Sequence, residues 1–253
     1  MTMSGATQSN SYGWLNSSET GFGRFLVGGL LASLFPPRCL LCGSATTGVK
    51  VLCEQCAAEL PSLEGMRCRR CQEALNDIRL DLCHSCGTRA WGFDLARSLG
   101  SYKGAWGDLV RALKFDGERA VARLLCARLA AYLTDEEPFG TIDVVTYVPM
   151  SRSDRRKRGF NQAHLLAQGI GRRIGIPARR LLLKVRKTPP QAALPAPERR
   201  ENLRGAFRLI RSGKGRVLLV DDIYTTGSTV EECARTLKDG GYEAVYVLTV
   251  ARA

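Results

Sequence analysis

The sequence predicts an α/β protein in which an open, mostly parallel sheet flanked by helices follows a small cysteine-rich domain. Two patterns indicate this division. Eight cysteines form four C-x-x-C pairs between residues 39 and 86, and from about residue 95 strand-like runs alternate with amphipathic helical patterns. The chain has 253 residues, 45% hydrophobic and 24% charged. These ordinary globular values exclude a wholly disordered or fibrous chain.

The N-terminal segment precedes both parts. Residues 1–24 are rich in Ser, Asn, Thr and Gly, and we expect a disordered tail. Residues 25–38 contain the apolar run FLVGGLLASLFPP, which predicts a short amphipathic helix stopped by the prolines, with contact to a membrane surface as the alternative. This run is shorter than the roughly 20 residues of a membrane span, and only Arg24 supplies a basic side chain before it, unlike a signal peptide. We therefore expect no membrane span and a reducing, cytoplasmic location in which the cysteines do not form disulfides.

Residues 39–90 are predicted to form a double zinc ribbon. The expected ligands, in four pairs, are Cys39, Cys42, Cys53, Cys56, Cys68, Cys71, Cys83 and Cys86. Two cysteines separated by two residues chelate one metal from a tight turn, and two such turns complete a tetrahedral four-thiolate site. Four turns therefore predict two closed, structural zinc sites. We expect the turns to pair sequentially, with His84 as a bystander; a cross-braced arrangement and iron–sulfur ligation are the alternatives.

Residues 95–253 are predicted to form the sheet domain. The expected elements, in chain order, are helices at 109–113 and 122–133, a strand at 143–149, a helix at 161–174, strands at 180–185 and 217–221, a helix at 228–238 and a strand at 244–250. This alternation implies parallel strands joined by right-handed crossovers, with ligands bound beyond the carboxyl ends of the strands. Cys126 and Cys233 lie on helical patterns and are expected to be small buried side chains.

Residues 217–229, with the sequence VLLVDDIYTTGST, carry the strongest functional signal. A buried strand runs into the adjacent carboxylates of Asp221 and Asp222 and then into a small-residue loop that opens a helix. The loop residues are Thr225, Thr226, Gly227, Ser228 and Thr229. Their hydroxyls and closely packed amides at a positive helix N-terminus are suited to hold a phosphate. The carboxylates can accept hydrogen bonds from vicinal hydroxyls or help to hold magnesium, so the segment predicts a sugar-phosphate site.

The net charge of +13 is concentrated in one stretch. Residues 151–216 hold 19 Lys or Arg and three Asp or Glu, a balance of +16, whereas the rest of the chain holds 18 basic and 21 acidic residues. Such a stretch indicates an anionic partner, either a nucleic acid or a phosphorylated small molecule.

The segment 217–229 resembles, throughout its length, the 5-phosphoribosyl-1-pyrophosphate (PRPP) binding motif of type I phosphoribosyltransferases. Three other segments resemble the ComF/GntX family, whose members are competence-associated and phosphoribosyltransferase-like and carry an N-terminal double zinc ribbon. These segments are the cysteine turns after Phe35-Pro36-Pro37, the run RxRGFNQ at 156–162, and Gln191 through Arg199-x-x-Asn202 to Ala206-Phe207. The resemblance covers about residues 34–252 and implies a type I phosphoribosyltransferase-like fold for residues 95–253.

This resemblance also implies roles for individual residues. Thr225–Thr229 would hold the ribose 5-phosphate, and Asp221 and Asp222 would bind the ribose hydroxyls as the catalytic pair. Pyrophosphate is expected at the loop after Val148-Pro149 and at nearby cations. The residues of this set are Met150, Ser151, Arg152, Arg155, Arg156, Arg158 and Lys114. Residues 187–203 would correspond to the mobile hood over the active site of such enzymes.

The implied function is a pentosyl transfer associated with DNA uptake, competence or recombination. PRPP would bind with magnesium, and an acceptor would displace pyrophosphate at the anomeric carbon through an oxocarbenium-like transition state. The alternative is a catalytically weak zinc-ribbon adaptor that binds single-stranded DNA through the basic stretch during natural transformation, with DNA-uptake proteins as partners.

Overall fold

A computed structural model describes residues 37–48, 50–115, 119–186 and 202–253. The expected tail at 1–24, nearly all of the expected helix at 25–38 and most of the expected hood at 187–203 lie outside the described residues. The described elements, in chain order, are α2 (Glu54–Ala58), α3 (His84–Thr88), β1 (Leu95–Ser101), α4 (Ala105–Phe115), α5 (Arg119–Asp135), β2 (Val144–Tyr147), α6 (Arg152–Arg158), α7 (Gln162–Ile174), β3 (Leu182–Lys184), β4 (Phe207–Leu209), β5 (Arg216–Tyr224), α9 (Ser228–Asp239) and β6 (Ala244–Arg252).

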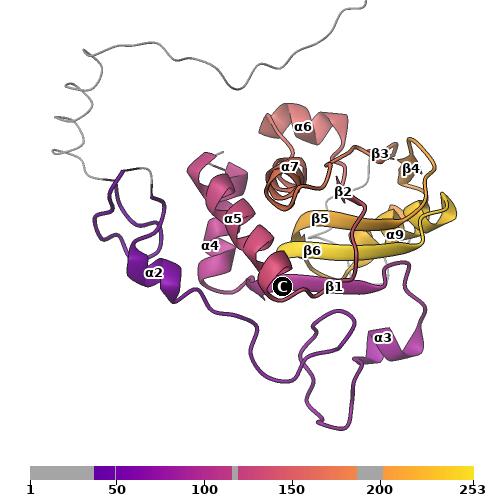
Figure 1. The fold of residues 1–253 in the computed structure, drawn as a ribbon, viewed down its shortest axis with the longest axis horizontal. Helices are drawn as coiled ribbons and strands as arrows, with labels where there is room; N and C mark the ends of the chain where they lie inside the picture. The colour runs from indigo at the N-terminus through magenta and orange to yellow at the C-terminus, as the bar shows by residue number, and fades with distance from the viewer. Residues whose placement is uncertain (1–36, 49, 116–118, 187–201) are drawn as a thin grey trace, which may run out of the picture.

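The main sheet contains four strands in the order β1-β6-β5-β2, and every neighbouring pair is parallel (Figure 1). In the interior strand β5, Val217 pairs with Val144 of β2 on one side and with Val245 of β6 on the other. A separate antiparallel pair is formed by β3 and β4. The predicted mostly parallel sheet is confirmed.

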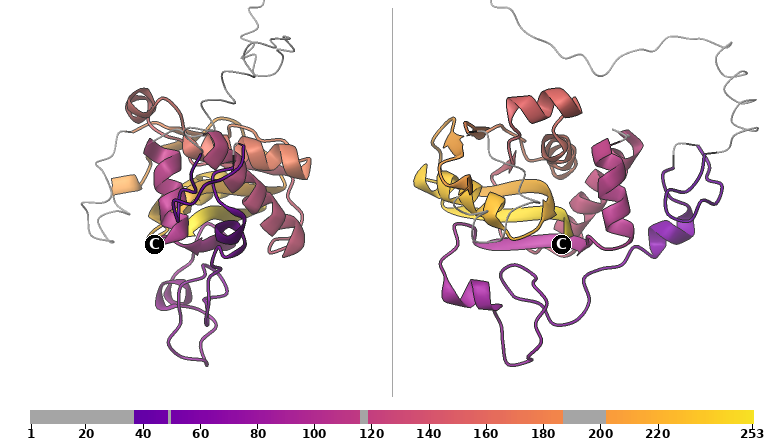
Figure 2. Two further views of the ribbon diagram at one scale, coloured as in Figure 1. Left: turned by 90° about the vertical axis from the view of Figure 1, so that its left-hand side faces the viewer. Right: turned by 180° about the vertical axis from the view of Figure 1, so that it is seen from behind.

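Helices cover both faces of this sheet, which explains the continuous apolar run of β5. Leu218 shares one hydrophobic cluster with Leu125 of α5 and Ile170 of α7. Its neighbour Leu219 points to the opposite face and shares the second cluster with Leu237 of α9. Because successive strand residues face opposite sides, α4, α5 and α7 form one layer, and α9 with the β3–β4 pair forms the other (Figures 1 and 2).

Several elements differ from the sequence-based prediction: α2, α3, β1, β4 and α6 were not expected, and β5 is longer than expected. The edge strand β1 was not predicted, because its sequence LARSLGS alternates buried and half-buried residues without an apolar run. The predicted strand at 217–221 continues to Tyr224, which pairs with Arg252 of β6. The basic segment RSDRRKR forms helix α6 with no buried residue, so it has no apolar periodicity, and its ends are defined by Ser151 and Gly159.

The two cysteine-rich segments pack against different parts of the sheet domain (Figures 1 and 2). The first lies beside α4 and α5, where Trp106 Nε1 donates a hydrogen bond to Pro61 O and Arg128 donates one to Ala57 O. The second runs below β1, where Ala96 N donates to Arg70 O at 2.7 Å. Both segments therefore contribute to the packing of the α/β part.

Membrane insertion through a helix finds no support in the described residues. None of their helices combines the length and the hydropathy that crossing a bilayer requires.

Candidate functional site

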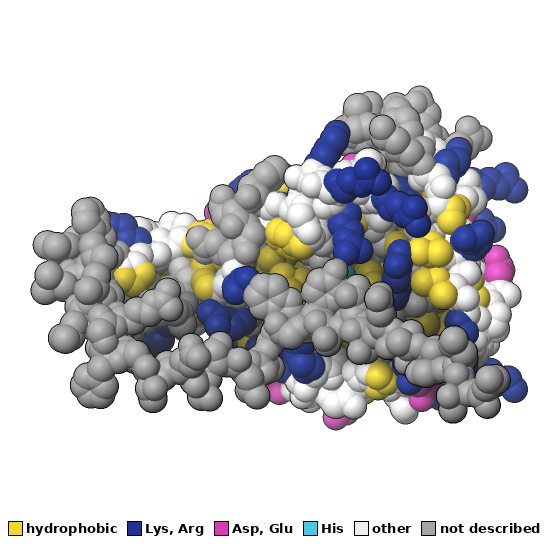
Figure 3. Space-filling model, turned by 90° about the horizontal axis from the view of Figure 1, so that it is seen from above, with side chains coloured by type: hydrophobic (Ala, Val, Ile, Leu, Met, Phe, Trp, Pro, Cys, Tyr) yellow, Lys and Arg dark blue, Asp and Glu magenta, His cyan; other side chains and the backbone are white. Residues whose placement is uncertain are grey.

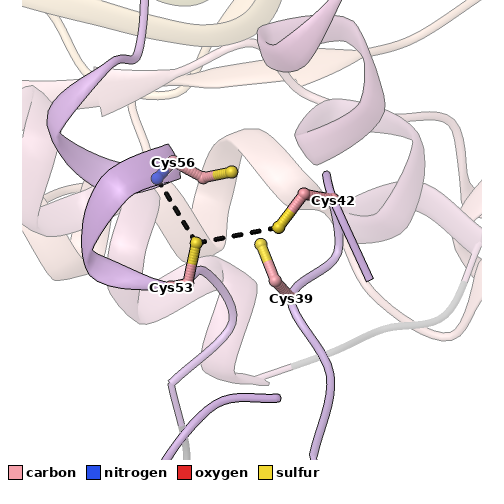
Figure 4. Close-up of side chains that lie close together, drawn as sticks. All are labelled: Cys39, Cys42, Cys53 and Cys56. Atoms are coloured by element: carbon pink, nitrogen blue, oxygen red, sulfur yellow. Dashed lines mark hydrogen bonds between the residues drawn. The ribbon is translucent and has the colours of Figure 1, made fainter. Parts of the chain in front are cut away.

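Two four-cysteine clusters are present in the described residues. They consist of Cys39, Cys42, Cys53 and Cys56, and of Cys68, Cys71, Cys83 and Cys86. In each cluster the sulfur atoms lie within 4.8 Å of one another, and in the first they converge on one point (Figure 4). The turns are therefore paired sequentially, as expected, and not cross-braced.

The sulfur geometry fits zinc. Zn–S bonds of about 2.3 Å in a tetrahedron place the sulfur atoms about 3.8 Å apart. The Sγ atoms of Cys42 and Cys53 are 3.7 Å apart, and so are those of Cys71 and Cys83. His84 begins α3 and belongs to neither cluster, in agreement with its predicted bystander role. The residues thus fit two structural zinc ribbon sites.

The two clusters differ in burial. Cys42 is exposed and Cys53 and Cys56 are half-buried in the first cluster, whereas Cys68 and Cys71 of the second are only 1% and 4% exposed. The second cluster joins the hydrophobic core on the α9 side of the sheet. It is consequently part of the packing beneath the sheet and not a peripheral appendage.

The two remaining cysteines are buried in helices, as predicted. Cys126 of α5 is 3% exposed and Cys233 of α9 is fully buried. Burial raises the pKa of the Cys126 thiol to about 11 and also raises the pKa of Cys233. Both thiols therefore stay protonated and act as core side chains.

The paired carboxylates lie toward the carboxyl end of β5. Lys114 Nζ, at the end of α4, is 3.0 Å from Asp222 Oδ2, and these side chains are 20% and 13% exposed. The backbone N–H of Asp222 donates to Asp221 Oδ1 at 2.9 Å. Burial and the neighbouring charge of Asp222 raise the pKa of Asp221 well above its usual value. The pair is thus a concentrated, partly desolvated acceptor site held beside a cation.

The small-residue loop connects β5 to α9. Gly227 is the N-cap of α9 with a φ of 76°, and a Cβ there would lie 2.7 Å from Tyr224 Cζ and 3.0 Å from Trp91 Cζ3. Only glycine satisfies both constraints. The hydroxyl oxygens of Thr226 and Ser228 are 2.9 Å apart. The loop therefore presents hydroxyls and helix N-terminal amides immediately after the carboxylate pair.

A pocket of about 140 Å³ lies beside these carboxylates. The described residues that line it are Lys114, Val148, Pro149, Met150, Ser151, Asp154, Arg158, Asn161, Gln162, Ala163, Lys184, Asp221 and Asp222. It brings together six of the residues predicted for the site. Arg152, Arg155, Arg156 and the loop 225–229 are not among the lining residues.

The position of helix α6 explains why only one of the four predicted arginines lines the pocket. Ser151 caps the helix, since its hydroxyl accepts from Asp154 N at 3.1 Å and donates to Asp154 Oδ2 at 2.6 Å. Arg152 is consequently the first residue of α6, and it is exposed together with Arg155 and Arg156. Lys and Arg side chains gather on the face of the molecule that carries α6 and α7 (Figure 3). Of the four predicted arginines, only Arg158 reaches the pocket lining.

Four polar residues of the pocket were not predicted from the sequence. Two of them lie at the start of α7, with Asn161 as the N-cap and Gln162 as the first helical residue. Asn161 caps the helix by accepting from His164 N, and its Nδ2 donates to Val148 O at 3.1 Å. Gln162 is 2% exposed, and its Oε1 accepts from Arg158 Nη1 at 3.3 Å. Both lie in the segment RGFNQ, so the signal was present in the sequence although no role was assigned to them.

The other two missed residues are Asp154 and Lys184. Asp154 is held by Ser151, as described above. Lys184 ends β3, and burial lowers the pKa of its ammonium group while the carboxylates of Asp154 and Asp221 counteract this effect. No contiguous motif marks either residue.

Comparison with known proteins agrees with the cysteine geometry and with the chain as a whole. The family model "Double zinc ribbon domain" matches residues 30–87. "Competence protein F" of Haemophilus influenzae is 30% identical over 232 residues, which are 88% of this chain and 100% of that protein. "DNA utilization protein YhgH" of Escherichia coli is 30% identical over 85% of this chain and 89% of that protein, and "Competence protein ComFC" of Streptococcus pneumoniae is 23% identical over 85% and 100%.

Solved structures with some likeness to part of the chain include a PRPP amidotransferase and an adenine phosphoribosyltransferase. Glutamine PRPP amidotransferase from B. subtilis is 25% identical, with a TM-score of 0.35, over 51% of this chain and 26% of that one. Adenine phosphoribosyltransferase from Leishmania tarentolae is 14% identical, with a TM-score of 0.35, over 59% and 76%. The identity to Competence protein F extends over that protein's full length and includes both the cysteine clusters and the sheet domain. The chain therefore belongs to the ComF family, the family of Competence protein F, and in it a double zinc ribbon precedes a parallel α/β sheet domain.

Proposed function

We propose that this protein binds PRPP with magnesium at the carboxyl end of β5 and transfers the phosphoribosyl group to an acceptor. The observation that carries the proposal is the continuous arrangement of a half-buried carboxylate pair, Asp221 and Asp222, and the Gly227 loop at the N-terminus of α9. A sugar phosphate requires acceptors for its hydroxyls and donors for its phosphate, and this segment offers both within nine residues.

Each part of the site has a chemical role in this proposal. The carboxylates of Asp221 and Asp222 accept hydrogen bonds from the ribose hydroxyls, and the loop 225–229 holds the 5-phosphate. Carboxylate oxygens are ligands that magnesium accepts together with phosphate oxygens, so the acidic pair fits this cation. The acidic pair would hold magnesium together with the ligand, and the bound ion would supply positive charge for the departing pyrophosphate. Lys114 pairs with Asp222 at 3.0 Å, so it orients this carboxylate before ligand binds.

Isothermal titration calorimetry with PRPP and Mg²⁺ tests this function. We expect one binding event in the wild type and its loss in the double variant Asp221→Asn/Asp222→Asn. A matched control, Asp135→Asn/Asp239→Asn, removes two exposed carboxylates at helix ends and should bind normally. Absence of heat in the wild type, or unchanged affinity in the site variant, would contradict the proposal. Pyrophosphate release measured with a panel of nucleobases then identifies the acceptor.

A second candidate function is binding of single-stranded DNA. It is favoured by three arginines of α6, Arg152, Arg155 and Arg156, which are exposed and do not line the pocket. An exposed basic surface of this kind binds a phosphate backbone with a strong dependence on salt. The relative YhgH is named a DNA utilization protein, which agrees with such a partner.

Fluorescence anisotropy with a labelled oligonucleotide tests the second candidate. Charge reversal at Arg152, Arg155 and Arg156 should abolish binding at moderate salt. The control reverses three exposed basic residues elsewhere, Lys103, Arg123 and Arg235, and keeps the same net charge. Equal binding by the two triple variants would refute a specific α6 interface.

A further inference from the structure

The geometry points to Gln162 and Lys184 as the residues that bind the pyrophosphate group of the ligand, in place of the exposed arginines of α6. This inference rests on the proposed site and extends it to two residues that have no assigned role. Gln162 begins α7 and Lys184 ends β3, and both line the pocket beside Asp221 and Asp222. Both side chains carry N–H donors, the Nε2 amide of Gln162 and the ammonium group of Lys184.

The side chain of Gln162 is buried and has an unpaired donor in the described structure. It is 98% buried, and the guanidinium of Arg158 donates to its Oε1, which fixes the orientation of the amide. Its Nε2 has no hydrogen-bond partner among the described residues. A buried donor without a partner destabilises the folded state by about 1–3 kcal/mol, so proteins rarely keep one without use. A ligand oxygen in the pocket would satisfy this donor.

Lys184 supplies a positive charge to the same space. Within the described part of the chain, no carboxylate forms an ion pair with its ammonium group, although the side chain is only half-exposed. The pocket carboxylates already have other partners. Asp154 accepts from the Ser151 hydroxyl, Asp222 pairs with Lys114, and Asp221 accepts from a backbone N–H. Lys184 thus lies at a polar pocket without a direct ion pair among the described residues, and the nearby carboxylates of Asp154 and Asp221 favour its charged form.

The chemistry of these donors identifies the ligand group. Ribose hydroxyls are matched by the carboxylates, whereas an amide N–H and an ammonium group are matched by an anion with several acceptor oxygens. The N-terminus of α7, at which Gln162 lies, adds a positive electrostatic potential. Met150 and Ser151, the predicted pyrophosphate loop, line the same pocket. A pyrophosphate group meets these requirements because it is an anion with several acceptor oxygens.

Two substitutions isolate the proposed contacts. Gln162→Glu keeps an oxygen that accepts from Arg158, removes the Nε2 donor and adds a negative charge. Lys184→Met keeps most of the aliphatic stem and removes the ammonium group. The matched controls are Gln168→Glu, an exposed position on the same helix, and Lys157→Met, an exposed lysine of α6 that does not line the pocket. Thermal melting verifies that all four variants are folded.

Calorimetry with three probes, PRPP with Mg²⁺, pyrophosphate with Mg²⁺ and ribose 5-phosphate, measures the effect. We expect each site variant to bind PRPP and pyrophosphate about tenfold or more weakly, because a hydrogen bond to a charged group is lost. Affinity for ribose 5-phosphate should change less than about twofold, and both controls should match the wild type.

The outcomes separate this inference from the proposed function. If the wild type binds PRPP and both site variants bind it equally well, the assignment of Gln162 and Lys184 is wrong and the proposed function stands. If the wild type binds pyrophosphate through these residues but not PRPP, the assignment stands and the proposed function fails. A wild type that binds none of the three probes overturns both. Equal weakening of pyrophosphate and ribose 5-phosphate would also reject the assignment, since it indicates a general loss of the site.

Discussion

Arg252, the last residue of β6, links the second zinc cluster to the candidate phosphate loop. Its side chain is 7% exposed, its Nη1 donates to Cys71 O at 2.8 Å, and its Nη2 pairs with the carboxylate of Glu73. The guanidinium carbon also lies 4.6 Å from the centre of the Tyr224 ring, which in turn leaves room only for glycine at position 227. Substitution Arg252→Met should therefore disturb the zinc cluster and the loop together.

The expected loss of stability follows from these contacts. The bond from the guanidinium to the buried carbonyl of Cys71 contributes about 1.5–3 kcal/mol. The cation–π contact with Tyr224 adds about 0.5–1 kcal/mol. Glu73 is half-exposed, so its ion pair is screened by solvent and contributes about 0.5 kcal/mol. Methionine retains much of the apolar packing, and we expect a decrease of about 3 kcal/mol in the free energy of unfolding.

Three assays and one control variant test this prediction. Urea denaturation measures stability, zinc release to a chelator measures retention of the metal, and calorimetry measures PRPP affinity. In Arg252→Met we expect one of the two zinc ions to leave faster and PRPP to bind more weakly. The control Arg128→Met removes the bond from α5 to Ala57 O, which anchors the first zinc segment, and should leave PRPP affinity unchanged. The link is refuted if both variants affect PRPP binding equally, or if Arg252→Met retains wild-type stability.

Three further predictions concern zinc, the loop and pH. A chelator should remove zinc first from the first cluster, in which only Cys39 is buried, and circular dichroism should show the larger loss of structure when the second cluster, with three buried cysteines, is depleted. Gly227→Ala should destabilise the protein by about 2 kcal/mol and weaken PRPP binding, because alanine is strained at a φ of 76° and its Cβ contacts Tyr224. Burial and the charges of Arg155 and Arg180 lower the pKa of His164 in the folded state below the ordinary 6.5, so its contribution to stability is present above pH 6.5 and is lost as the pH falls. Chemical denaturation of His164→Gln between pH 7 and 5 should accordingly show a smaller decrease in stability than the wild type.

Local patterns predicted the zinc ligands and the carboxylate loop because their chemistry lies within short segments. The cysteine turns and the segment 217–229 combine spacing, residue type and position after a strand. Gln162 and Lys184 could not be assigned in this way. From the sequence, a glutamine at the start of an amphipathic helix is expected to face solvent. Gln162 is buried because α7 packs beside β2 and β5. Likewise, Lys184 reaches the pocket because β3 pairs with β4, which lies more than 20 residues further along the chain.

The basic stretch 151–216 is divided by the fold into two groups with different chemistry. Arg152, Arg155 and Arg156 are exposed on α6, where mobile ions screen their charges. Lys184 and Arg158 line the pocket, where Lys184 is half-buried and Arg158 is held by its hydrogen bond to Gln162 Oε1. The same basic stretch can therefore bind two anionic partners at different surfaces. The dependence of each affinity on salt concentration distinguishes the two surfaces. Between about 50 and 200 mM salt, DNA bound through α6 should lose orders of magnitude in affinity, whereas PRPP bound in the pocket should lose much less. Equal salt dependence of the two ligands would show that they share one surface.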